Sequence, residues 1–219
     1  MADAIDLPPA RAARQAEFAP EHAVYEILDK ACLCHVSTMV DDVPMLVPMA
    51  YSRMGREIIL HGPVRGRLMQ TLASGAATTV CVTHLDGLVL ARSQFHHSMN
   101  YRCVLLTGCP RLIADPKDKL SALAHMVEHI VPGRSRQARA PSKAELAATL
   151  IVGLGLERAT IKTRSGPPRD PVGDLDLDVW AGTIPIIQGV GAPVQAQGQP
   201  DTVGLSPALP DYMTKFRSI

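Results

Sequence analysis

Aromatic residues, surplus charge and long apolar runs are all scarce in this chain of 219 residues, and each scarcity excludes a class of function. Aromatic side chains make up 4% of the sequence, too few for the stacking platforms that bind single-stranded nucleic acid. The formal net charge is only +1, so the chain as a whole has no electrostatic attraction for a polyanion. No window approaches the roughly 18 uninterrupted apolar residues of a membrane-spanning helix. We therefore expect neither nucleic acid nor a membrane as a partner.

The cysteines and the N-terminus indicate a reducing compartment. Five cysteines are present, an odd number, and they show neither a CxxC motif nor the spacing of a zinc site. They are Cys32, Cys34, Cys81, Cys103 and Cys109. Because most lie inside apolar runs, we expect buried free thiols. The N-terminus lacks the apolar segment of a secretory signal, so we expect a soluble cytoplasmic protein.

Short apolar runs separated by turn residues predict a mainly antiparallel β fold. Apolar residues make up 47% of the chain, enough for a substantial core. The expected strands cover residues 32–39, 45–52, 58–62, 77–85, 88–108, 108–115, 159–164 and 183–190. Helices are expected at residues 20–31, 67–75 and 117–130, with a further short helix capped by Ser142 and Glu145. The strand–helix alternation of a doubly wound fold is absent, so the pattern favours a β-barrel with helical additions.

Composition also divides the chain into three segments. Residues 1–20 are rich in alanine, proline and charge, which predicts an N-terminal arm. Residues 21–188 carry the strands and helices and form the expected cofactor-binding domain. Residues 189–219 are rich in glycine, proline and glutamine, so we expect a loosely packed tail.

The segment Leu88–Gly108 places polar residues between two apolar runs. A turn is predicted just before it, at Asp86–Gly87, and a bend or break near residues 98–100, because the segment is long for one strand. On a straight strand His97 would lie on an apolar face, where a satisfied core histidine is the simplest interpretation. His96 would join a row of arginine, glutamine and asparagine side chains. That row indicates a binding site or subunit interface, or else a solvent-exposed face.

The segment from Leu60 to Met69 has the pattern of a phosphate site. A strand ends at a histidine, a Gly-Pro turn follows, and Arg65 and Arg67 flank a glycine where a helix begins. Backbone N–H groups at a helix start, together with guanidinium groups, can bind a phosphate. The alternative is an ordinary solvent-exposed turn with two surface arginines, because such turns are common.

Two further patterns point to hydrolases, and neither is sufficient. His125, Glu128 and His129 match the H-x-x-E-H pattern of inverted zinc metallopeptidases. A zinc peptidase also needs a third ligand and a general base in a cleft, so a packing or solvent-exposed helix face is the favoured interpretation. The G-x-S-x-G elbow of serine hydrolases is absent.

Five segments together resemble a known family. They are LHGPVRGR, THLDGLVLARSQFHHSMNYR, HIVPGR, RSGPPRD and VWAGTIP, in that order. Over residues 21–187 the chain resembles the nitroimidazole-resistance-like branch of the pyridoxamine 5'-phosphate oxidase-related flavin-nucleotide-binding proteins. The resemblance implies an FMN-binding split β-barrel that forms a homodimer with two cofactor sites at the subunit interface.

The resemblance also implies which residues hold the cofactor. The strand with Val47–Met49 would run along the isoalloxazine ring through its backbone, and the turn from His61 to Arg67 would bind the ribityl phosphate. A region around residues 96–101 would lie near the dimer interface, and the single tryptophan would either close the pocket or serve as a packing anchor. The residues so assigned are Val47, Pro48, Met49, His61, Gly62, Arg65, Arg67, His96, His97, Asn100, Tyr101 and Trp180.

The phosphate turn departs from the family pattern. Similar proteins have serines after the His-Gly pair, whereas this chain has Pro63, which lacks an N–H group, and Gly66, which lacks a hydroxyl. Arg65 would compensate for the missing donors. The alternative is that the cofactor is haem b, as in other split-barrel proteins, with His61 as the axial ligand.

The resemblance implies a flavin-dependent oxidoreductase that acts on a small molecule by two-electron chemistry, nitroreductase-like or oxidase-like. A haem-dependent enzyme or haem-binding protein of the same fold is the first alternative. A flavin-binding stress protein without turnover is the second.

Overall fold

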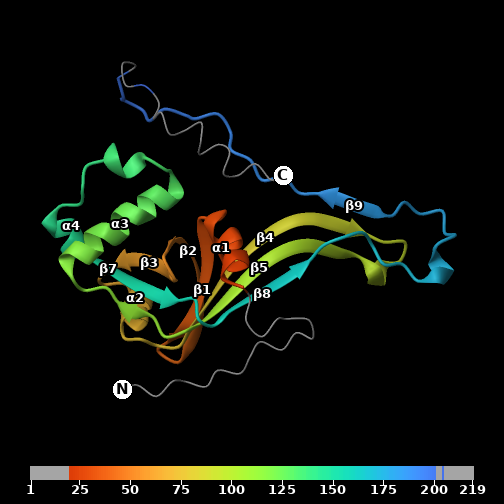
Figure 1. Cartoon of the computed structure of the whole chain (residues 1–219), viewed down its shortest axis with the longest axis horizontal. Coiled ribbons are helices and arrows are strands. Elements are labelled where there is room, and N and C mark those ends of the chain that lie inside the picture. Colours follow the sequence, from red (N-terminus) through yellow and green to blue (C-terminus); the bar gives the residue numbers. More distant parts are fainter. Residues whose placement is uncertain (1–19, 201–203, 205–219) are drawn as a thin grey trace.

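A curled antiparallel sheet forms the body of the protein in the computed structural model, which describes residues 20–200 and 204 (Figure 1). Its nine strands follow the order β6-β7-β3-β2-β1-β4-β5-β8, and β9 pairs with β4 off this path. The strands are β1 (Leu33–Val40), β2 (Val43–Met54), β3 (Glu57–Pro63), β4 (Thr78–Leu90), β5 (Ser98–Gly108), β6 (Arg111–Leu112), β7 (Thr149–Gly155), β8 (Ala159–Arg164) and β9 (Gly182–Pro185). The expected antiparallel, mainly β fold is confirmed, and so is the meander of its first three strands.

Two of the described helices, α3 and α4, begin where their capping residues predict. In the described part of the chain the helices are α1 (Glu21–Asp29), α2 (Arg67–Ala73), α3 (Pro116–Ile130) and α4 (Lys143–Ala147), with 3₁₀ turns η1 (Gln94–His96), η2 (Arg134–Arg136) and η3 (Val172–Asp174). The Asp115 side chain accepts hydrogen bonds from the first N–H groups of α3, and Ser142 and Glu145 form the expected capping box of α4. None of these helices is long and apolar enough to span a bilayer.

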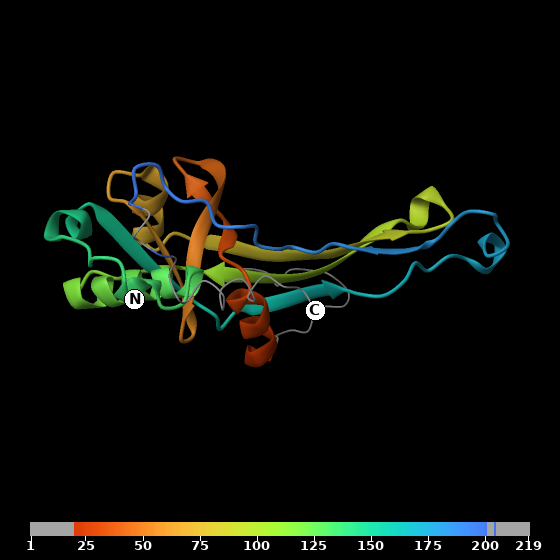
Figure 2. The same ribbon diagram turned by 90° about the horizontal axis from the view of Figure 1, so that it is seen from above.

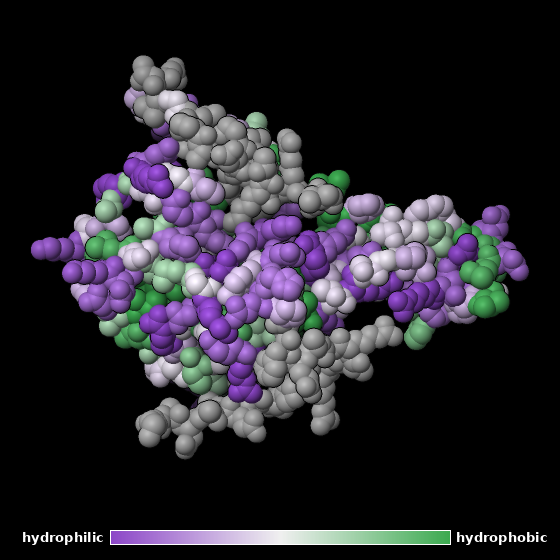
Figure 3. Space-filling model, viewed as in Figure 1, coloured by the Kyte–Doolittle hydropathy of each residue, from purple (hydrophilic) through white to green (hydrophobic). Residues whose placement is uncertain are grey.

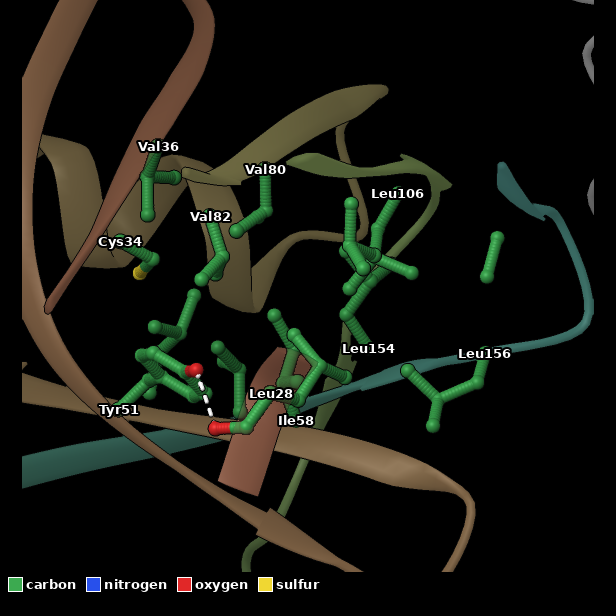
Figure 4. Close-up of a cluster of buried hydrophobic side chains, with 14 of the residues drawn as sticks. Leu28, Cys34, Val36, Tyr51, Ile58, Val80, Val82, Leu106, Leu154 and Leu156 are labelled. Atoms are coloured by element: carbon green, nitrogen blue, oxygen red, sulfur yellow. Dashed lines mark hydrogen bonds between the residues drawn. The ribbon is translucent and has the colours of Figure 1, made fainter. Parts of the chain in front are cut away.

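The core fills the inside of the curled sheet, and α1 packs against it. Val24, Ile27 and Leu28 of α1 are buried among apolar side chains from β1, β2, β3, β4, β5 and β7. Figure 4 shows part of this cluster, with Leu28 beside Tyr51 and Ile58. A second, smaller cluster lies under α3, which packs its buried Met126 against β3 and β7. The sheet therefore holds α1 on one side and α3 on the other.

Side chains from neighbouring elements bind the C-terminal end of α1. The Tyr51 hydroxyl of β2 donates to the Leu28 carbonyl at 2.6 Å, and His84 Nε2 of β4 donates to the Ile27 carbonyl at 3.0 Å. His129 Nε2 of α3 donates to the Ala31 carbonyl at 2.7 Å, just beyond the helix. The last carbonyls of a helix lack the i+4 partner, so these side chains supply donors there, and the Leu28 carbonyl also accepts a longer hydrogen bond from the Ala31 N–H at 3.4 Å.

The H-x-x-E-H segment serves packing, as favoured above. His125 Nε2 donates to the Arg53 carbonyl at 2.7 Å, while His129 binds the carbonyl that follows α1. Glu128 accepts hydrogen bonds from the backbone of Gly133 and from Ser135. Both histidines thus donate to backbone oxygens, and the described residues contain no group of three side chains placed to bind a metal.

The turn predicted at Asp86–Gly87 is wrong, because β4 runs through it. The ladder between β4 and β5 shifts register between Leu85 and Gly87, which is a β-bulge. Asp86 accepts both hydrogen bonds of a bidentate pair with Arg102, at 2.9 and 2.7 Å, and Arg102 lowers the pKa of Asp86. The dipeptide that favours a turn locally is held in an extended strand by this cross-strand ion pair.

The break predicted near residues 98–100 lies a few residues earlier. The chain leaves β4 after Leu90, passes through η1 and enters β5 at Ser98. His96 lies in η1 and His97 directly follows it, so the straight-strand sorting that placed His97 on an apolar core face is wrong. Both histidines are on a connecting turn because the two strands form a long hairpin.

Strand β7 is absent from the predicted elements, although it is central to the barrel. It pairs with β3 along its whole length, from Thr149 opposite Pro63 to Gly155 opposite Glu57. Its side chains from Ile151 to Leu154 are buried in a continuous run. A strand buried on both faces lacks the alternation that identifies half-buried strands.

The expectation of buried thiols holds for Cys34 and Cys103 only. Cys32 and Cys81 are half-buried, and Cys109 is exposed. No disulfide joins any of these cysteines within the described structure.

Strands β4 and β5 extend beyond the barrel as an arm (Figures 1 and 2). Near the barrel, residues 78–81 of β4 pair with β1, and farther out residues 87–90 pair with β9. The bulge lies between these two pairings. A Cβ atom at Gly87 would meet the Ile184 carbonyl oxygen of β9 at 3.0 Å, so glycine permits this close approach. We call the distal part of β4, η1, the start of β5, residues 165–181 and β9 the arm.

Replacing Tyr51 with phenylalanine should destabilise the fold by about 0.5–1.5 kcal/mol, because the Leu28 carbonyl would lose its short hydrogen bond and keep only the longer one from the Ala31 N–H. Urea unfolding followed by circular dichroism measures the difference. Tyr25→Phe is the matched control, because that hydroxyl binds Glu21 at the surface, and it should leave the midpoint unchanged. Equal midpoints for Tyr51→Phe and wild type would contradict the anchoring role of this bond.

Candidate functional site

One edge of β2 is open where the sheet splits. Residues 43–50 of β2 pair with β1, whereas residues 51–54 pair with β3. Beyond Leu60, β3 continues along β7 through Pro63 and no longer pairs with β2. Within the described structure, residues 43–50 therefore have no strand partner on their second edge.

The ladder decides which backbone groups face this open edge. The Tyr51 N–H donates to the Cys32 carbonyl at 3.3 Å, so odd-numbered residues of β2 use their backbone groups toward β1. Even-numbered residues such as Pro48 and Ala50 then direct theirs to the open edge. Of the three β2 residues expected at the cofactor, Pro48 thus offers a carbonyl, and Val47 and Met49 lie in the ladder opposite Val36 and Cys34. The sequence alone does not show whether the odd-numbered or the even-numbered residues of β2 direct their backbone groups to the open edge.

The side chains of β2 alternate between the two faces of the sheet, with the odd-numbered ones toward the core and the even-numbered ones on the outer face. Tyr51 is buried, and Val47 and Met49 are half-buried toward the core. Leu46 is 65% exposed on the outer face, where Met39 of β1 is also exposed. The outer surface beside the open edge is therefore apolar, a surface suited to a planar ring.

His61 lies at the end of β3, opposite Ile151 of β7. Its Nδ1 atom is buried and has no hydrogen-bond partner in the described structure. Burial lowers the pKa of His61, so the ring is neutral near pH 7. A buried, neutral imidazole with an unused nitrogen is a suitable ligand for a metal or a donor to a bound group.

Gly62 and Gly66 shape the turn that follows β3. A Cβ atom at Gly62 would lie 2.6 Å from Cγ of Met69, so only glycine lets α2 pack this closely on the strand. Gly66 is the N-cap of α2 and supplies no side chain to it. The Gly66 N–H donates to the Pro63 carbonyl and the Val64 N–H to the Ala148 carbonyl, each at 2.9 Å. These two backbone donors are occupied, which leaves the arginine side chains as the main anion-binding groups.

Arg65 and Arg67 are both exposed at this turn. Arg67 Nη1 lies 2.7 Å from Asp41 Oδ2, a pair in which both side chains are about 70% exposed. Asp41 and Asp42 have positive φ angles of 50° and 60° and form the tight turn between β1 and β2. The pair therefore brings the β1–β2 turn beside the start of α2, and the solvent-exposed guanidinium group remains accessible to an anion.

The remaining expected residues lie in the arm. Ser93 Oγ and His96 Nδ1 are 2.6 Å apart, and His97 Nδ1 donates to the Ser93 carbonyl at 2.9 Å, so both rings are oriented by their own turn. Asn100 Nδ2 donates to the Gly166 carbonyl at 3.2 Å, and its amide oxygen accepts from Arg164. These bonds tie the two sides of the arm together.

Tyr101 and Trp180 differ in exposure. Tyr101 is half-buried between its strand partners Leu85 and Arg164. Trp180 is 65% exposed, and its ring lies against Gly182, where a Cβ atom would approach it to 2.9 Å. The tryptophan therefore covers the backbone of the arm with one part and presents the rest to solvent.

The arm carries a large apolar surface for its size. Phe95 is 89% exposed and Val172 is 84% exposed, and Ile187, just beyond the arm, is 76% exposed. Figure 3 shows hydrophobic residues gathered at the end of the arm. A ribbon of three strands has no core of its own to bury such side chains.

The structure thus divides the expected residues into two groups. Pro48, His61, Gly62 and the two arginines lie where β2 and β3 separate, whereas the other group lies along the arm. No described hydrogen bond or ion pair joins the two groups. The ion pair of Arg92 with Asp170, at 2.8 Å, lies just before η1 and was not predicted from the sequence. Asp170 belongs to the RSGPPRD segment, which indicated a family resemblance but no contact with Arg92.

A surface pocket of about 210 Å³ lies elsewhere, under α3. Met54, Arg111, Ile113, Asp118 and Ser121 line it, and none of these belongs to the expected site. It is smaller than usual cofactor pockets and is set apart from the open edge of β2.

Comparisons with known proteins show the family and the fold of this chain. Residues 20–163 match the family model described as pyridoxamine 5'-phosphate oxidase. A solved structure described as the FAD and haem binding protein from Mycobacterium smegmatis is 32% identical, with a TM-score of 0.87, and the match covers 94% of this chain and 100% of that one. The flavocytochrome Anf3 from Azotobacter vinelandii is also 32% identical, with a TM-score of 0.84, over 96% of this chain and 99% of that one.

A more distant structure shares the fold alone. It is described as a 5-nitroimidazole antibiotic resistance protein from Bacteroides thetaiotaomicron, with 16% identity and a TM-score of 0.56 over 69% of this chain and 88% of that one. The expected split-barrel fold is thereby confirmed. No curated protein matches the sequence.

Proposed function

Because the chain belongs to the pyridoxamine 5'-phosphate oxidase family, we propose that it is a flavin-binding redox protein that acts on a small molecule. The observation that carries the proposal is the open edge of β2 beside the turn from His61 to Arg67. This edge offers backbone acceptors and donors, an apolar outer surface and two guanidinium groups within one part of the barrel. These are the groups that a flavin nucleotide requires, because it has a planar ring with a polar rim and an anionic phosphate.

Each part of the site has a role toward the flavin. The Pro48 carbonyl and the Ala50 N–H on the open edge are suited to the polar rim of the isoalloxazine ring. Arg65 and Arg67 are suited to the ribityl phosphate, because guanidinium groups bind phosphate oxygens in pairs. When bound, the flavin would supply two-electron redox chemistry, while the chain binds and orients it.

The form of the flavin is FAD or FMN. FMN was expected from the family resemblance, whereas the two relatives of 32% identity are described as binding FAD and haem or as a flavocytochrome. FAD and FMN share the ribityl phosphate, so the Arg65 and Arg67 assignment holds for both. We favour FAD because the relative described as binding FAD aligns over 94% of this chain.

Haem is proposed as a second prosthetic group. The supporting observation is the buried, partnerless Nδ1 of His61, in a ring whose pKa is lowered by burial. Neutral imidazole is the form of histidine that binds haem iron. The descriptions of both relatives include haem or a cytochrome, so haem need not be an alternative to the flavin in this chain.

The working form is proposed to be a homodimer. The arm exposes Phe95, Val172 and Trp180, and it carries the expected residues that lie away from the open edge of β2. A second copy would cover this apolar surface, and its arm would bring those residues to the neighbouring barrel. The competing function is that of a protein that binds flavin without turnover. The two functions are distinguished by reducing the bound flavin with a chemical or enzymatic donor and measuring whether the electrons pass to a small acceptor.

Arg65→Ala combined with Arg67→Ala should weaken flavin binding about tenfold or more, because two charge-assisted contacts to the phosphate would be lost. Flavin released by denaturation is identified by mass spectrometry and its amount per chain is measured by absorbance. The matched control is Arg56→Ala, which removes an exposed arginine that pairs with Glu21. Unchanged flavin content in the double variant would contradict the phosphate assignment.

His61→Ala should abolish the Soret band of protein produced with added haem precursor and leave the flavin content largely intact. Absorption spectra of the oxidised and dithionite-reduced protein measure both groups separately. His22→Ala, in an exposed position of α1, is the control. A Soret band of undiminished intensity in His61→Ala would refute the axial assignment, and its absence from the wild type would refute haem binding.

Phe95→Ser combined with Val172→Ser should shift the protein from dimer to monomer, because both side chains are almost fully exposed on one chain. Sedimentation velocity over a range of concentrations measures the association. Val194→Ser is the control, because Val194 is 94% exposed but lies beyond the arm. A wild type that sediments as a monomer would end the proposal.

A mixed dimer tests whether the arm serves the partner's site. Subunits with Trp180→Ala and subunits with Arg65→Ala and Arg67→Ala would each be deficient alone. A dimer of one of each contains one site with an intact barrel and an intact arm. Recovery of about half the wild-type flavin content is expected, whereas no recovery would show that each arm serves the site of its own subunit.

A further inference from the structure

Two cysteines meet on neighbouring strands of the sheet. The Sγ atoms of Cys81 in β4 and Cys103 in β5 are 3.5 Å apart. Cys81 lies opposite Leu105 and Cys103 lies opposite Thr83, so the two cysteines are diagonal neighbours in the ladder. The Thr83 hydroxyl is 3.3 Å from Cys81 Sγ. Two thiols and a hydroxyl therefore form one small polar cluster on one face of this strand pair.

The cluster favours one thiolate. The Cys103 thiol, as donor to Cys81, and to a smaller extent the Thr83 hydroxyl together lower the pKa of Cys81 to about 6 against the opposing effect of burial. The pKa of Cys103 is raised, chiefly by its bond to Cys81 and then by burial. His35 on β1 also acts to lower the pKa of Cys81, and Lys162 on β8 acts to lower that of Cys103. The two thiols share one proton, which is the usual arrangement of a reactive dithiol.

The two sulfurs differ in access. Cys81 is half-buried, and its strand partner on β1, His35, is exposed. Cys103 is 7% exposed, behind the first sulfur. By contrast, burial raises the pKa of Cys34 to about 12, and its thiol donates to the Met49 carbonyl. The accessible sulfur of the pair is thus the one that carries the charge, whereas Cys34 is an inert core thiol.

We propose that Cys81 and Cys103 form a reversible oxidation site, at which Cys81 reacts with a hydroperoxide and Cys103 resolves the product to a disulfide. Neither the flavin nor the haem takes part in this step, so the site goes beyond the proposed redox function.

The reaction balances with hydrogen peroxide as the oxidant. The Cys81 thiolate attacks one peroxide oxygen, the O–O bond breaks, and the departing hydroxide takes a proton and leaves as water, which gives a sulfenic acid on Cys81. The Cys103 sulfur then attacks the Cys81 sulfur, the S–O bond breaks, and the hydroxide takes the Cys103 proton. In sum, two thiols and one hydrogen peroxide give one disulfide and two waters.

The position in the ladder makes the disulfide labile. Cα atoms of diagonal neighbours are roughly 7–8 Å apart, beyond the range of about 4.4–6.8 Å in most disulfides. Closing the bond therefore requires β4 and β5 to shift locally, and a bond held under such constraint is readily reduced. This matches a regulatory modification better than a structural crosslink. The shift would fall on the segment that connects the barrel with the bulge of the arm.

Stepwise oxidation of the full-length protein tests the proposal. The protein is reduced, freed of reductant and treated with increasing hydrogen peroxide, and thiols are counted after denaturation. We expect the loss of two of the five thiols, a mass decrease of two hydrogen atoms, and one crosslinked peptide pair containing Cys81 and Cys103. Dithiothreitol should restore both thiols.

Single variants separate the two roles. Cys103→Ser should stop the reaction at a sulfenic acid on Cys81 that dimedone traps, and Cys81→Ser should abolish both products. Cys109→Ser is the control, because Cys109 is the exposed cysteine, and it should leave the crosslink unchanged. A disulfide that joins other cysteines, or a crosslink that persists in Cys81→Ser, would overturn the proposal.

The pH dependence of alkylation provides an independent measurement. Cys81 should react with iodoacetamide down to about pH 6, whereas glutathione in the same mixture should slow steeply below its thiol pKa of roughly 8.5–9. The ratio of the two rates should rise about fortyfold between pH 8 and pH 6, because the lower nucleophilicity of a low-pKa thiolate scales the ratio equally at both pH values. A constant ratio would show that Cys81 has no stabilised thiolate. Added peroxide and alkylating agent act on protein with or without flavin, so this outcome is independent of the cofactor proposal.

Discussion

The end of α1 is the constraint on which the arrangement of the barrel depends. Its last carbonyls need partners, and Tyr51, His84 and His129 supply them from three different elements. Tyr51 is also the residue at which β2 changes neighbours, because its N–H donates to Cys32, just before β1, and its strand partner on β3 is Leu60. The helix therefore fixes the point at which the sheet splits. The open edge that begins beyond this point, and with it the proposed flavin site, follows from the packing of a helix on the other side of the strand.

The bulge in β4 plays a corresponding part for the arm. On one side of it β4 pairs with β1 and belongs to the barrel, and on the other side it pairs with β9. The Asp86–Arg102 pair holds the strand through this change of neighbours. The barrel and the arm thus contain different parts of the same two strands, and the twist at the bulge sets the orientation of the arm relative to the barrel.

Local signals in the sequence predicted the local structure. The aspartate before Pro116 and the Ser142–Glu145 pair gave the starts of two helices because capping is decided within four residues. The prediction of a turn at Asp86–Gly87 was wrong because the turn preference of this dipeptide is outweighed by the ion pair with Arg102, which forms only when β5 pairs with β4. Strand β7 was missed because a strand buried on both faces shows no alternation.

The candidate site was predictable to a similar extent. His61, Arg65 and Arg67 follow from a motif, and the structure adds the unused Nδ1 of His61. The open edge of β2 was out of reach because it depends on β3 joining β7, which comes much later in the chain. The thiol pair was equally hidden, since Cys81 and Cys103 meet only through the register of a long hairpin.

That hairpin also limits how the arm can vary among related chains. Because side chains alternate between the two faces of a strand, adding one residue to β4 would exchange the faces of everything beyond it. Lengths that change by two residues on each strand preserve the faces, whereas a bulge such as that at Leu85–Gly87 accommodates an odd residue. In descendants of this architecture the arm should therefore lengthen or shorten in even steps, with bulges marking the exceptions.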